Sequence, residues 1–134
     1  RMLSMGLPGE ADPKMRILVI DDEPAVAAVI AEALREEGHE VSTAGGGEQG
    51  LRAMAESPPD AVFLDIVMPG MDGIEVLRRI RARSPDLPVI ILSGWAGKSQ
   101  LDEARRLGVT DILQKPVALR TLSSALARAA TAER

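Results

Sequence analysis

The amino-acid sequence predicts an α/β fold in which helices cover both faces of a parallel β-sheet. Two observations carry this prediction: short apolar runs alternate with amphipathic stretches along the chain, and the central run is apolar at four consecutive positions. Such a continuous run is typical of a strand that is buried on both faces. This run, Ala61–Leu64, leads directly into Asp65 and then into a loop rich in proline and glycine.

Length and composition limit the possibilities further. With 134 residues the chain is long enough for one domain that buries roughly two thirds of its unfolded surface. Phe63 and Trp95 are its only aromatic residues, so we expect an aliphatic core. The absence of cysteine excludes disulfides and fits a reducing cytoplasm. A net charge of −4 and the lack of a long apolar run indicate no direct nucleic-acid partner and no membrane span.

The first half of the chain contains local signals for two strand–helix pairs. Residues 16–20 are mostly apolar, Pro24 suits the first position of a helix, and Gly38 ends that helix. The weak alternation over 40–44 predicts an edge strand, and a short second helix follows the glycines at 45–47. The first helix is expected to turn Val26, Val29, Ile30, Ala33 and Leu34 inward.

The second half repeats this alternation three times. After the strand at 61–64, Asp72 and Glu75 have the spacing of a capping box and predict a third helix. Strands are predicted at 89–92 and 112–114, with a helix of thin apolar face at about 99–107 between them. The third and last helices are expected to bury Ile74, Leu77, Ile80, Leu119, Leu122 and Leu126.

A flavodoxin-like, doubly wound sheet of five parallel strands in the order 2-1-3-4-5, with five helices, accommodates this alternation. In such a sheet the carboxyl ends of all strands lie on one rim, which is where ligands bind. The polar residues that follow the four inner strands would therefore converge. They are Asp21 and Asp22 after the first strand, Asp65 after the third, Ser93 after the fourth and Lys115 after the fifth.

The charges on this rim predict its chemistry. Two carboxylates about 5 Å apart repel each other by roughly 3 kcal/mol at an effective dielectric constant near 20. Three carboxylates and one ammonium therefore favour a divalent cation with oxygen ligands, Mg²⁺ or Mn²⁺. A metal beside an aspartate, a lysine and a hydroxyl group suits phosphoryl transfer. Asp65 would attack phosphorus, while Lys115 and Ser93 would bind the phosphoryl oxygens.

The chain contains an ordered set of short motifs: Ile-Asp-Asp at 20–22, Leu-Asp-Ile-Val-Met-Pro-Gly-Met-Asp-Gly at 64–73, Leu-Ser-Gly at 92–94, Leu-Gly-Val-Thr-Asp at 107–111 and Lys-Pro at 115–116. This set resembles the response-regulator receiver domains of bacterial two-component signalling. The resemblance covers residues 15–130. It predicts a receiver domain at 15–134, preceded at 1–14 by a disordered tail or a remnant of cloning.

The resemblance also implies roles for single residues. Asp65 would accept a phosphoryl group from a sensor histidine kinase or a histidine phosphotransfer protein. Asp22, Asp65 and the backbone carbonyl of Val67 would bind Mg²⁺, which Asp21 would reach through a water molecule. The peptide bond between Lys115 and Pro116 would be cis. Such a domain catalyses only its own phosphorylation and dephosphorylation, and it passes the signal to an output domain or protein that the sequence does not identify.

Two departures from the family pattern affect the lifetime and the signal of the phosphorylated state. The residues two positions after Asp65 and Ser93 are Val67 and Trp95, and neither can orient an attacking water molecule. We therefore expect slow self-dephosphorylation. Family members commonly carry Tyr or Phe three residues before the lysine, where this chain has Ile112. We expect the loop at 93–98 and the fourth helix to move instead, which would alter the face formed by helix 4, strand 5 and helix 5.

Two other functions are compatible with parts of the sequence. Residues 45–50 match the G-x-G-x-x-G pattern of dinucleotide-binding proteins, which would leave the acidic rim unexplained. A phosphatase of the haloacid dehalogenase type also uses an aspartyl nucleophile with Ser, Lys and paired acids. That family has a general-acid Asp two residues after its nucleophile, where this chain has Val67.

Other polar residues receive simpler interpretations. His39 is expected in a loop or at a strand edge, because a single histidine makes a poor metal site. The four arginines of the third predicted helix, Arg78, Arg79, Arg81 and Arg83, are expected to form a solvated face rather than a nucleic-acid patch.

Overall fold

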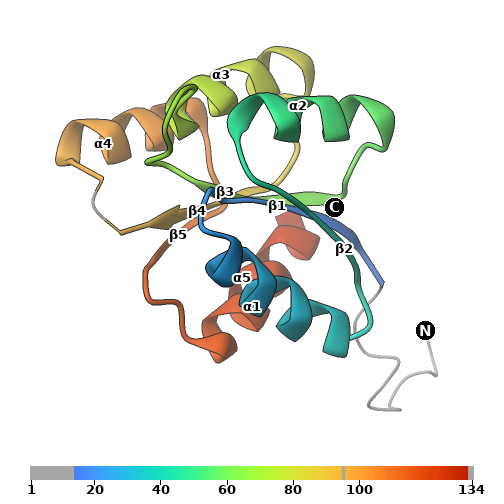
Figure 1. Ribbon diagram of the computed structural model, residues 1–134. Helices are drawn as coiled ribbons and strands as arrows, with labels where there is room; N and C mark the ends of the chain where they lie inside the picture. Colours follow the sequence, from blue (N-terminus) through green and yellow to red (C-terminus); the bar gives the residue numbers. More distant parts are fainter. Residues whose placement is uncertain (1–13, 95, 133–134) are drawn as a thin grey trace.

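The computed structural model describes residues 14–94 and 96–132. It contains one parallel sheet between two layers of helices (Figure 1). Residues 1–13, Trp95 and residues 133–134 lie outside the described residues. The expected tail at 1–14, apart from Lys14, and the expected role of Trp95 therefore stay predictions.

Strands and helices alternate as the sequence predicts, and the observed bounds of the five strands and of the fourth helix differ from the predicted ones by no more than one residue. The strands are β1 (Arg16–Ile20), β2 (Glu40–Ala44), β3 (Ala61–Asp65), β4 (Val89–Ser93) and β5 (Asp111–Gln114). The helices are α1 (Pro24–Glu36), α2 (Gly47–Glu56), α3 (Gly73–Arg83), α4 (Lys98–Leu107) and α5 (Leu119–Ala132). All four strand pairs are parallel, and the strand order is β2-β1-β3-β4-β5. The predicted flavodoxin-like topology is confirmed.

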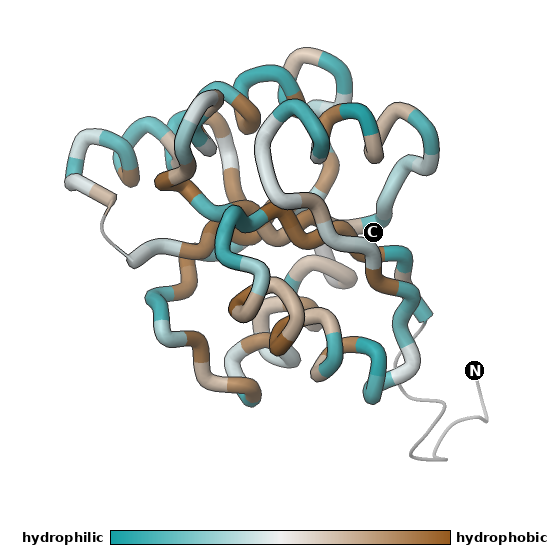
Figure 2. Tube along the Cα trace, viewed as in Figure 1, coloured by the Kyte–Doolittle hydropathy of each residue, from teal (hydrophilic) through white to brown (hydrophobic). Residues whose placement is uncertain are grey.

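Two aliphatic cores lie on the two faces of the sheet. Helices α1 and α5 cover one face, and α2, α3 and α4 cover the other (Figure 1). Every residue of β3 and β4 is buried, so the apolar segments concentrate in the centre of the molecule (Figure 2). Phe63 is the one aromatic side chain among the described residues, and it belongs to the core under α1 and α5.

Two residues that were expected inside are exposed. Val29 of α1 has 58% of its surface exposed, because α1 approaches the sheet through a face that includes the small residues Ala27 and Ala31. Leu119, the first residue of α5, is 54% exposed, and packing of that helix begins one turn later at Leu122. The other four residues predicted to face inward do contact the core, Ile30 and Leu34 as buried residues and Val26 and Ala33 as partly buried ones. The inward stripe of α1 also includes Ala27 and Ala31, which leaves Val29 outside it.

The fourth helix buries little apolar surface, and polar contacts help to hold it. Ala104 is the buried residue of α4. Arg81 of α3 donates hydrogen bonds to the carbonyl oxygens of Leu107 at 3.2 Å and Gly108 at 2.7 Å, at the carboxyl end of α4. Arg81 also donates to the carbonyl oxygen of Ser84 at 3.0 Å. The expectation of a fully solvated arginine face was therefore wrong for Arg81, since backbone carbonyls near α4 lacked other donors.

Two further polar residues have structural roles. The Asp72 side chain accepts a hydrogen bond from the Glu75 N–H at 3.0 Å and caps α3, as the capping-box spacing predicts. The Glu75 carboxylate turns to Arg79 at 3.0 Å and does not complete a reciprocal box. His39 lies just before β2, where it is buried, and its Nδ1 accepts the Met15 N–H at 3.0 Å.

The first turn of α3 packs directly on the loop that follows β3. A Cβ atom at Gly73 would lie 2.3 Å from the carbonyl oxygen of Asp65 and 2.6 Å from the Cα of Ile66. We expect G73A to lower the free energy of unfolding by about 2 kcal/mol or more, because the clash is with backbone. G97A is the matched control, since a Cβ at Gly97 meets nothing within 4 Å. Equal urea-denaturation midpoints for the two variants would contradict this prediction.

Candidate functional site

Three aspartates meet at the carboxyl end of the sheet. Asp21 and Asp22 directly follow β1, and Asp65 is the last residue of β3. One ligand oxygen from each lies within 4.8 Å of the other two. Asp21 and Asp65 are buried, and Asp22 is half-buried. The convergence expected from the strand order is therefore present.

Hydrogen bonds from the backbone fix the direction of two of these carboxylates. Asp21 Oδ1 accepts the Glu23 N–H at 2.9 Å, and Asp65 Oδ1 accepts the Val67 N–H at 3.2 Å. Aspartate commonly bonds the N–H group two residues further along the chain, which forms a local turn. Each carboxylate is thus held at the rim by the loop that follows its own strand. Val67 is 45% exposed beside Asp65.

Lys115 brings the last strand into the same site. Its backbone N–H donates to the Ser93 carbonyl oxygen at 2.8 Å, which joins the ends of β4 and β5. The Lys115–Pro116 peptide bond is cis, as predicted. The ammonium Nζ lies 3.2 Å from Asp65 Oδ2 and 2.9 Å from Asp21 Oδ2. Ser93 is buried at the end of β4, so the five polar side chains that were predicted to converge, those of Asp21, Asp22, Asp65, Ser93 and Lys115, all lie on one rim.

A fourth carboxylate at this site was missed in the sequence. Glu23 Oε1 lies 2.9 Å from the Lys115 Nζ and accepts a hydrogen bond from it. The signal was present, because Glu23 extends the Asp-Asp pair to three consecutive acids. Acids near a helix start are also common for electrostatic reasons, so the sequence did not distinguish this one.

The surroundings at the rim shift the pKa values of both Asp65 and Lys115. Burial raises the pKa of Asp65 to about 6, and the nearby Asp21 charge adds to this effect, while Lys115 opposes it. Burial also pulls the pKa of Lys115 down, but hydrogen bonds and charges from Glu23, Asp21 and Asp65 outweigh it and hold the pKa above its usual range. Lys115 is therefore an ammonium whenever the protein is folded near neutral pH.

The donor set fits a hard divalent cation. Asp21 Oδ2 is buried and has no hydrogen-bond partner among the described residues, although the Lys115 ammonium lies near it as an ion pair. Four carboxylates, those of Asp21, Asp22, Glu23 and Asp65, lie around one lysine, so excess negative charge remains there. Oxygen ligands with excess negative charge suit Mg²⁺ or Mn²⁺ better than a soft metal.

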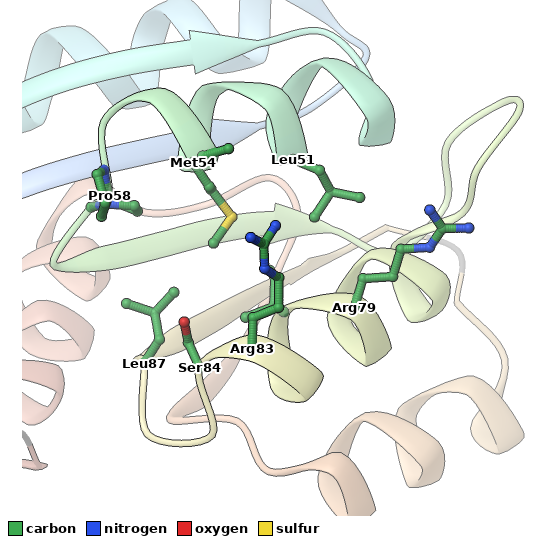
Figure 3. Close-up of a pocket in the computed structure, with 10 residues that line it drawn as sticks. Leu51, Met54, Pro58, Arg79, Arg83, Ser84 and Leu87 are labelled. Atoms are coloured by element: carbon green, nitrogen blue, oxygen red, sulfur yellow. The ribbon is translucent and has the colours of Figure 1, made fainter.

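A hollow in the described part of the chain lies away from the acidic rim. A cavity of about 270 Å³ opens between α2 and α3, lined by apolar side chains such as Met54 and Leu87 and by Arg79 and Arg83 (Figure 3). Its lining contains no carboxylate and no residue of the acidic rim. The ionisable groups that can perform chemistry are gathered at the sheet's carboxyl end instead.

Comparison with known proteins agrees with this site. The model of the response regulator receiver domain family matches residues 17–127. The chain belongs to this family. It is thus a receiver domain of the kind found in two-component response regulators, and the described residues include no helix long and apolar enough to cross a membrane.

Similar proteins support the assignment along most of the chain. The transcriptional regulatory protein AfsQ1 of Streptomyces coelicolor is 38% identical over 108 residues, which are 81% of this chain and 48% of that protein. Response regulator MprA of Mycobacterium avium is 39% identical over 108 residues, 81% of this chain and 47% of that protein. The receiver domain thus spans about half the length of the curated relatives it matches.

Solved structures match the whole architecture. The receiver domain of NtrX from Brucella abortus has a TM-score of 0.79 and 36% sequence identity, over 84% of this chain and 96% of that one. A CheY-like receiver domain protein from Methanospirillum hungatei has a TM-score of 0.85 and 26% identity, over 90% of this chain and 98% of that one.

The two alternative functions find no support. In the glycine-rich segment that resembles a dinucleotide-binding pattern, a Cβ at Gly50 would lie 2.5 Å from Ile20 Cδ1. A Cβ at Gly47 would lie 2.7 Å from Val76 Cγ2. These glycines allow α2 to pack closely on β1 and α3, which explains them without a bound nucleotide. Family membership likewise leaves the haloacid dehalogenase interpretation unsupported.

The raised pKa of Asp65 predicts a pH-dependent change in stability. The folded chain binds a proton at Asp65 more tightly than the unfolded chain, whose carboxyl has the ordinary pKa of 3.8. The contribution of this tighter proton binding to the free energy of unfolding is therefore lost as the pH rises from about 4 to about 6. In metal-free buffer we expect D65N to raise the free energy of unfolding by roughly 1–3 kcal/mol at pH 7.5, and by much less at pH 3.5.

Urea denaturation at the two pH values measures this difference. D86N is the control, because Asp86 is exposed and lies at the opposite end of the sheet, between α3 and β4. A gain for D65N that is the same at both pH values would show that the charge on Asp65 is not destabilising.

Proposed function

We propose that Asp65 is the phosphoacceptor of this receiver domain. The observation that carries the proposal is the pairing of a buried Asp65 carboxylate with the Lys115 ammonium 3.2 Å away, beside two further aspartates. A buried carboxylate with an exposed neighbouring loop can reach a donor molecule, and its lysine partner can neutralise incoming phosphoryl charge. The site residues of the proposal are Asp65, Lys115, Ser93, Asp21, Asp22 and Val67.

The reaction needs few groups from the protein. An Asp65 carboxylate oxygen forms the new bond to phosphorus as the bond between phosphorus and the donor breaks, and the donor keeps that electron pair. The donor is a phosphohistidine or a small acyl phosphate. Lys115 and the Ser93 hydroxyl donate hydrogen bonds to the phosphoryl oxygens. This domain changes only its own state, so its chemistry is phosphorylation and dephosphorylation of one side chain.

Asp22, Asp65 and the backbone carbonyl of Val67 would hold the metal ion, and Asp21 would reach it through water. When bound, Mg²⁺ or Mn²⁺ supplies charge neutralisation for the phosphoryl oxygens. The excess of carboxylates over the one lysine and the orphaned buried oxygen of Asp21 support this assignment. Asp21 is too enclosed to turn toward solvent for another partner.

The proposed donors are a sensor histidine kinase or a histidine phosphotransfer protein, which fits membership of the response regulator family. Relatives such as AfsQ1 are named transcriptional regulatory proteins and are about twice as long as the matched segment. A downstream output domain or protein is therefore part of the proposal. We propose no direct nucleic-acid contact by the receiver domain itself, and a cytoplasmic location, because the chain is acidic and lacks cysteine.

We further propose that the signal leaves through α4, β5 and α5. Ile112 of β5 is half-buried where the family commonly has an aromatic switch residue, and its β-branched side chain has little freedom to rotate. Helix α4 buries one residue and is fastened at its carboxyl end by Arg81. Its amino end, which follows the loop after Ser93, is therefore the part that can shift when the Ser93 hydroxyl closes on a phosphoryl group.

Phosphorylation by acetyl phosphate with Mg²⁺ tests the acceptor. We expect one phosphoryl adduct on the wild-type chain by intact-mass spectrometry, and none on D65N, because an amide keeps the shape but is no nucleophile. D22A should lose Mg²⁺ affinity by tenfold or more, whereas K115A should bind Mg²⁺ and lose phosphoryl stabilisation. An undiminished adduct on D65N would overturn the assignment of Asp65.

Amide hydrogen exchange tests the route of the signal. Addition of beryllofluoride with Mg²⁺ should change exchange at the amino end of α4 and leave α1 unchanged, since the loosely packed helix has the lower local stability. The fluorescence of Trp95, the only tryptophan, gives a second reading of the same loop. Bound beryllofluoride with unaltered exchange in α4 and unaltered Trp95 emission would contradict this route.

A further inference from the structure

Glu23 occupies one of the three places around the Lys115 ammonium. Its Oε1 lies 2.9 Å from Nζ, as close as Asp21 Oδ2 and closer than Asp65 Oδ2 at 3.2 Å. An ammonium has three N–H groups. Lys115 donates hydrogen bonds to Glu23 and Asp65, and the Asp21 carboxylate lies beside the ammonium as an ion pair. In the metal-free site, carboxylates therefore surround the Lys115 ammonium, and a phosphoryl oxygen must displace one of them.

The local backbone explains why the Glu23 side chain reaches the lysine. Glu23 is the N-cap residue of α1, yet its side chain makes no capping hydrogen bond. Glutamate is a poor N-cap, because the preferred capping residues have shorter side chains. The Glu23 N–H is meanwhile held by Asp21 Oδ1 at 2.9 Å, which keeps this residue at the rim.

The three carboxylates around Lys115 differ in the free-energy cost of separating them from the ammonium. The Asp21 side chain is fully buried, so losing its cation would leave an unpaired charge away from water. Asp65 is itself the proposed point of attachment of the phosphoryl group. The Glu23 side chain is 60% exposed and can turn into water at little cost. Glu23 is therefore the acceptor that a phosphoryl oxygen can displace.

We propose that Glu23 is a positioning residue that occupies Lys115 in the unphosphorylated state and is exchanged for a phosphoryl oxygen. This inference rests on the proposed function of Asp65. Glu23 would hold the ammonium in place between signals and at the same time weaken its first contact with the phosphoryl group. The direct contact of the Glu23 carboxylate with the Lys115 ammonium, rather than its negative charge alone, would weaken phosphoryl binding.

Beryllofluoride binding at saturating Mg²⁺ tests this exchange, because beryllofluoride bonds to a carboxylate oxygen as a phosphoryl group does. We expect E23Q to bind it about two- to fivefold more tightly than the wild-type chain, the range of an exposed ion pair. E32Q makes the same change of net charge on the exposed side of α1 and should match the wild-type chain. The Mg²⁺ affinity of each variant is measured first, so that saturation is assured.

E23D separates contact from charge. Aspartate keeps the negative charge, but it is one methylene shorter and is a preferred N-cap, so its carboxylate should turn to the N–H groups of α1. We expect E23D to bind beryllofluoride as tightly as E23Q. In the free protein, the ¹⁵N resonance of the Lys115 ammonium should shift in E23Q and E23D and not in E32Q.

The outcomes distinguish this inference from the proposed function. Equal beryllofluoride affinities in the wild-type chain and E23Q would overturn the role of Glu23 alone. An E23D variant that binds beryllofluoride with the affinity of the wild-type chain would also overturn it, because a negative charge that does not contact Lys115 would then be enough to weaken binding. A wild-type chain that binds no beryllofluoride would overturn the proposed function, and the exchange at Lys115 with it.

Discussion

The mutual repulsion of carboxylates at one rim, relieved by a single lysine, is the constraint on which the site depends. Strand ends in a parallel sheet lie side by side, so Asp21 and Asp65 cannot move apart without breaking β1 or β3. Lys115 reaches them because its own backbone is bonded to the end of β4. The result is an acidic site that is held together by the sheet and remains short of positive charge.

The shape of the rim also depends on two glycines at which helices pack closely against the sheet and its loops. Gly73 allows α3 to start against the backbone of Asp65 and Ile66, and Gly50 allows α2 to lie against Ile20. Both contacts place a helix beside the loop that carries a site residue. A pattern that suggested nucleotide binding is therefore explained by the packing of helices on the strands that position the aspartates.

The two ends of α4 have different partners, and the proposed signal route depends on this difference. At the carboxyl end, Arg81 binds two successive backbone carbonyls, while the amino end follows the loop after Ser93. The carboxyl end of α4 is therefore bonded to α3, whereas the hydrogen bonds at its amino end are local ones, such as that from the Gly97 N–H to Gln100. With an aliphatic Ile112 in β5, the proposed signal would pass through the backbone of this helix rather than through an aromatic ring.

The order of strands and helices, the rim and its named aspartates were determined by the sequence alone, because short apolar runs bounded by acids and turn residues predict buried strands, and the ends of parallel strands meet on one rim. Glu23 and Arg81 could not be assigned in this way. Their partners, Lys115 and the end of α4, lie 92 and 26 residues away along the chain, and only the tertiary structure brings them together. The exposure of Val29 was also decided by the fold, since a helical period gives the spacing of apolar residues but not the direction in which α1 meets the sheet.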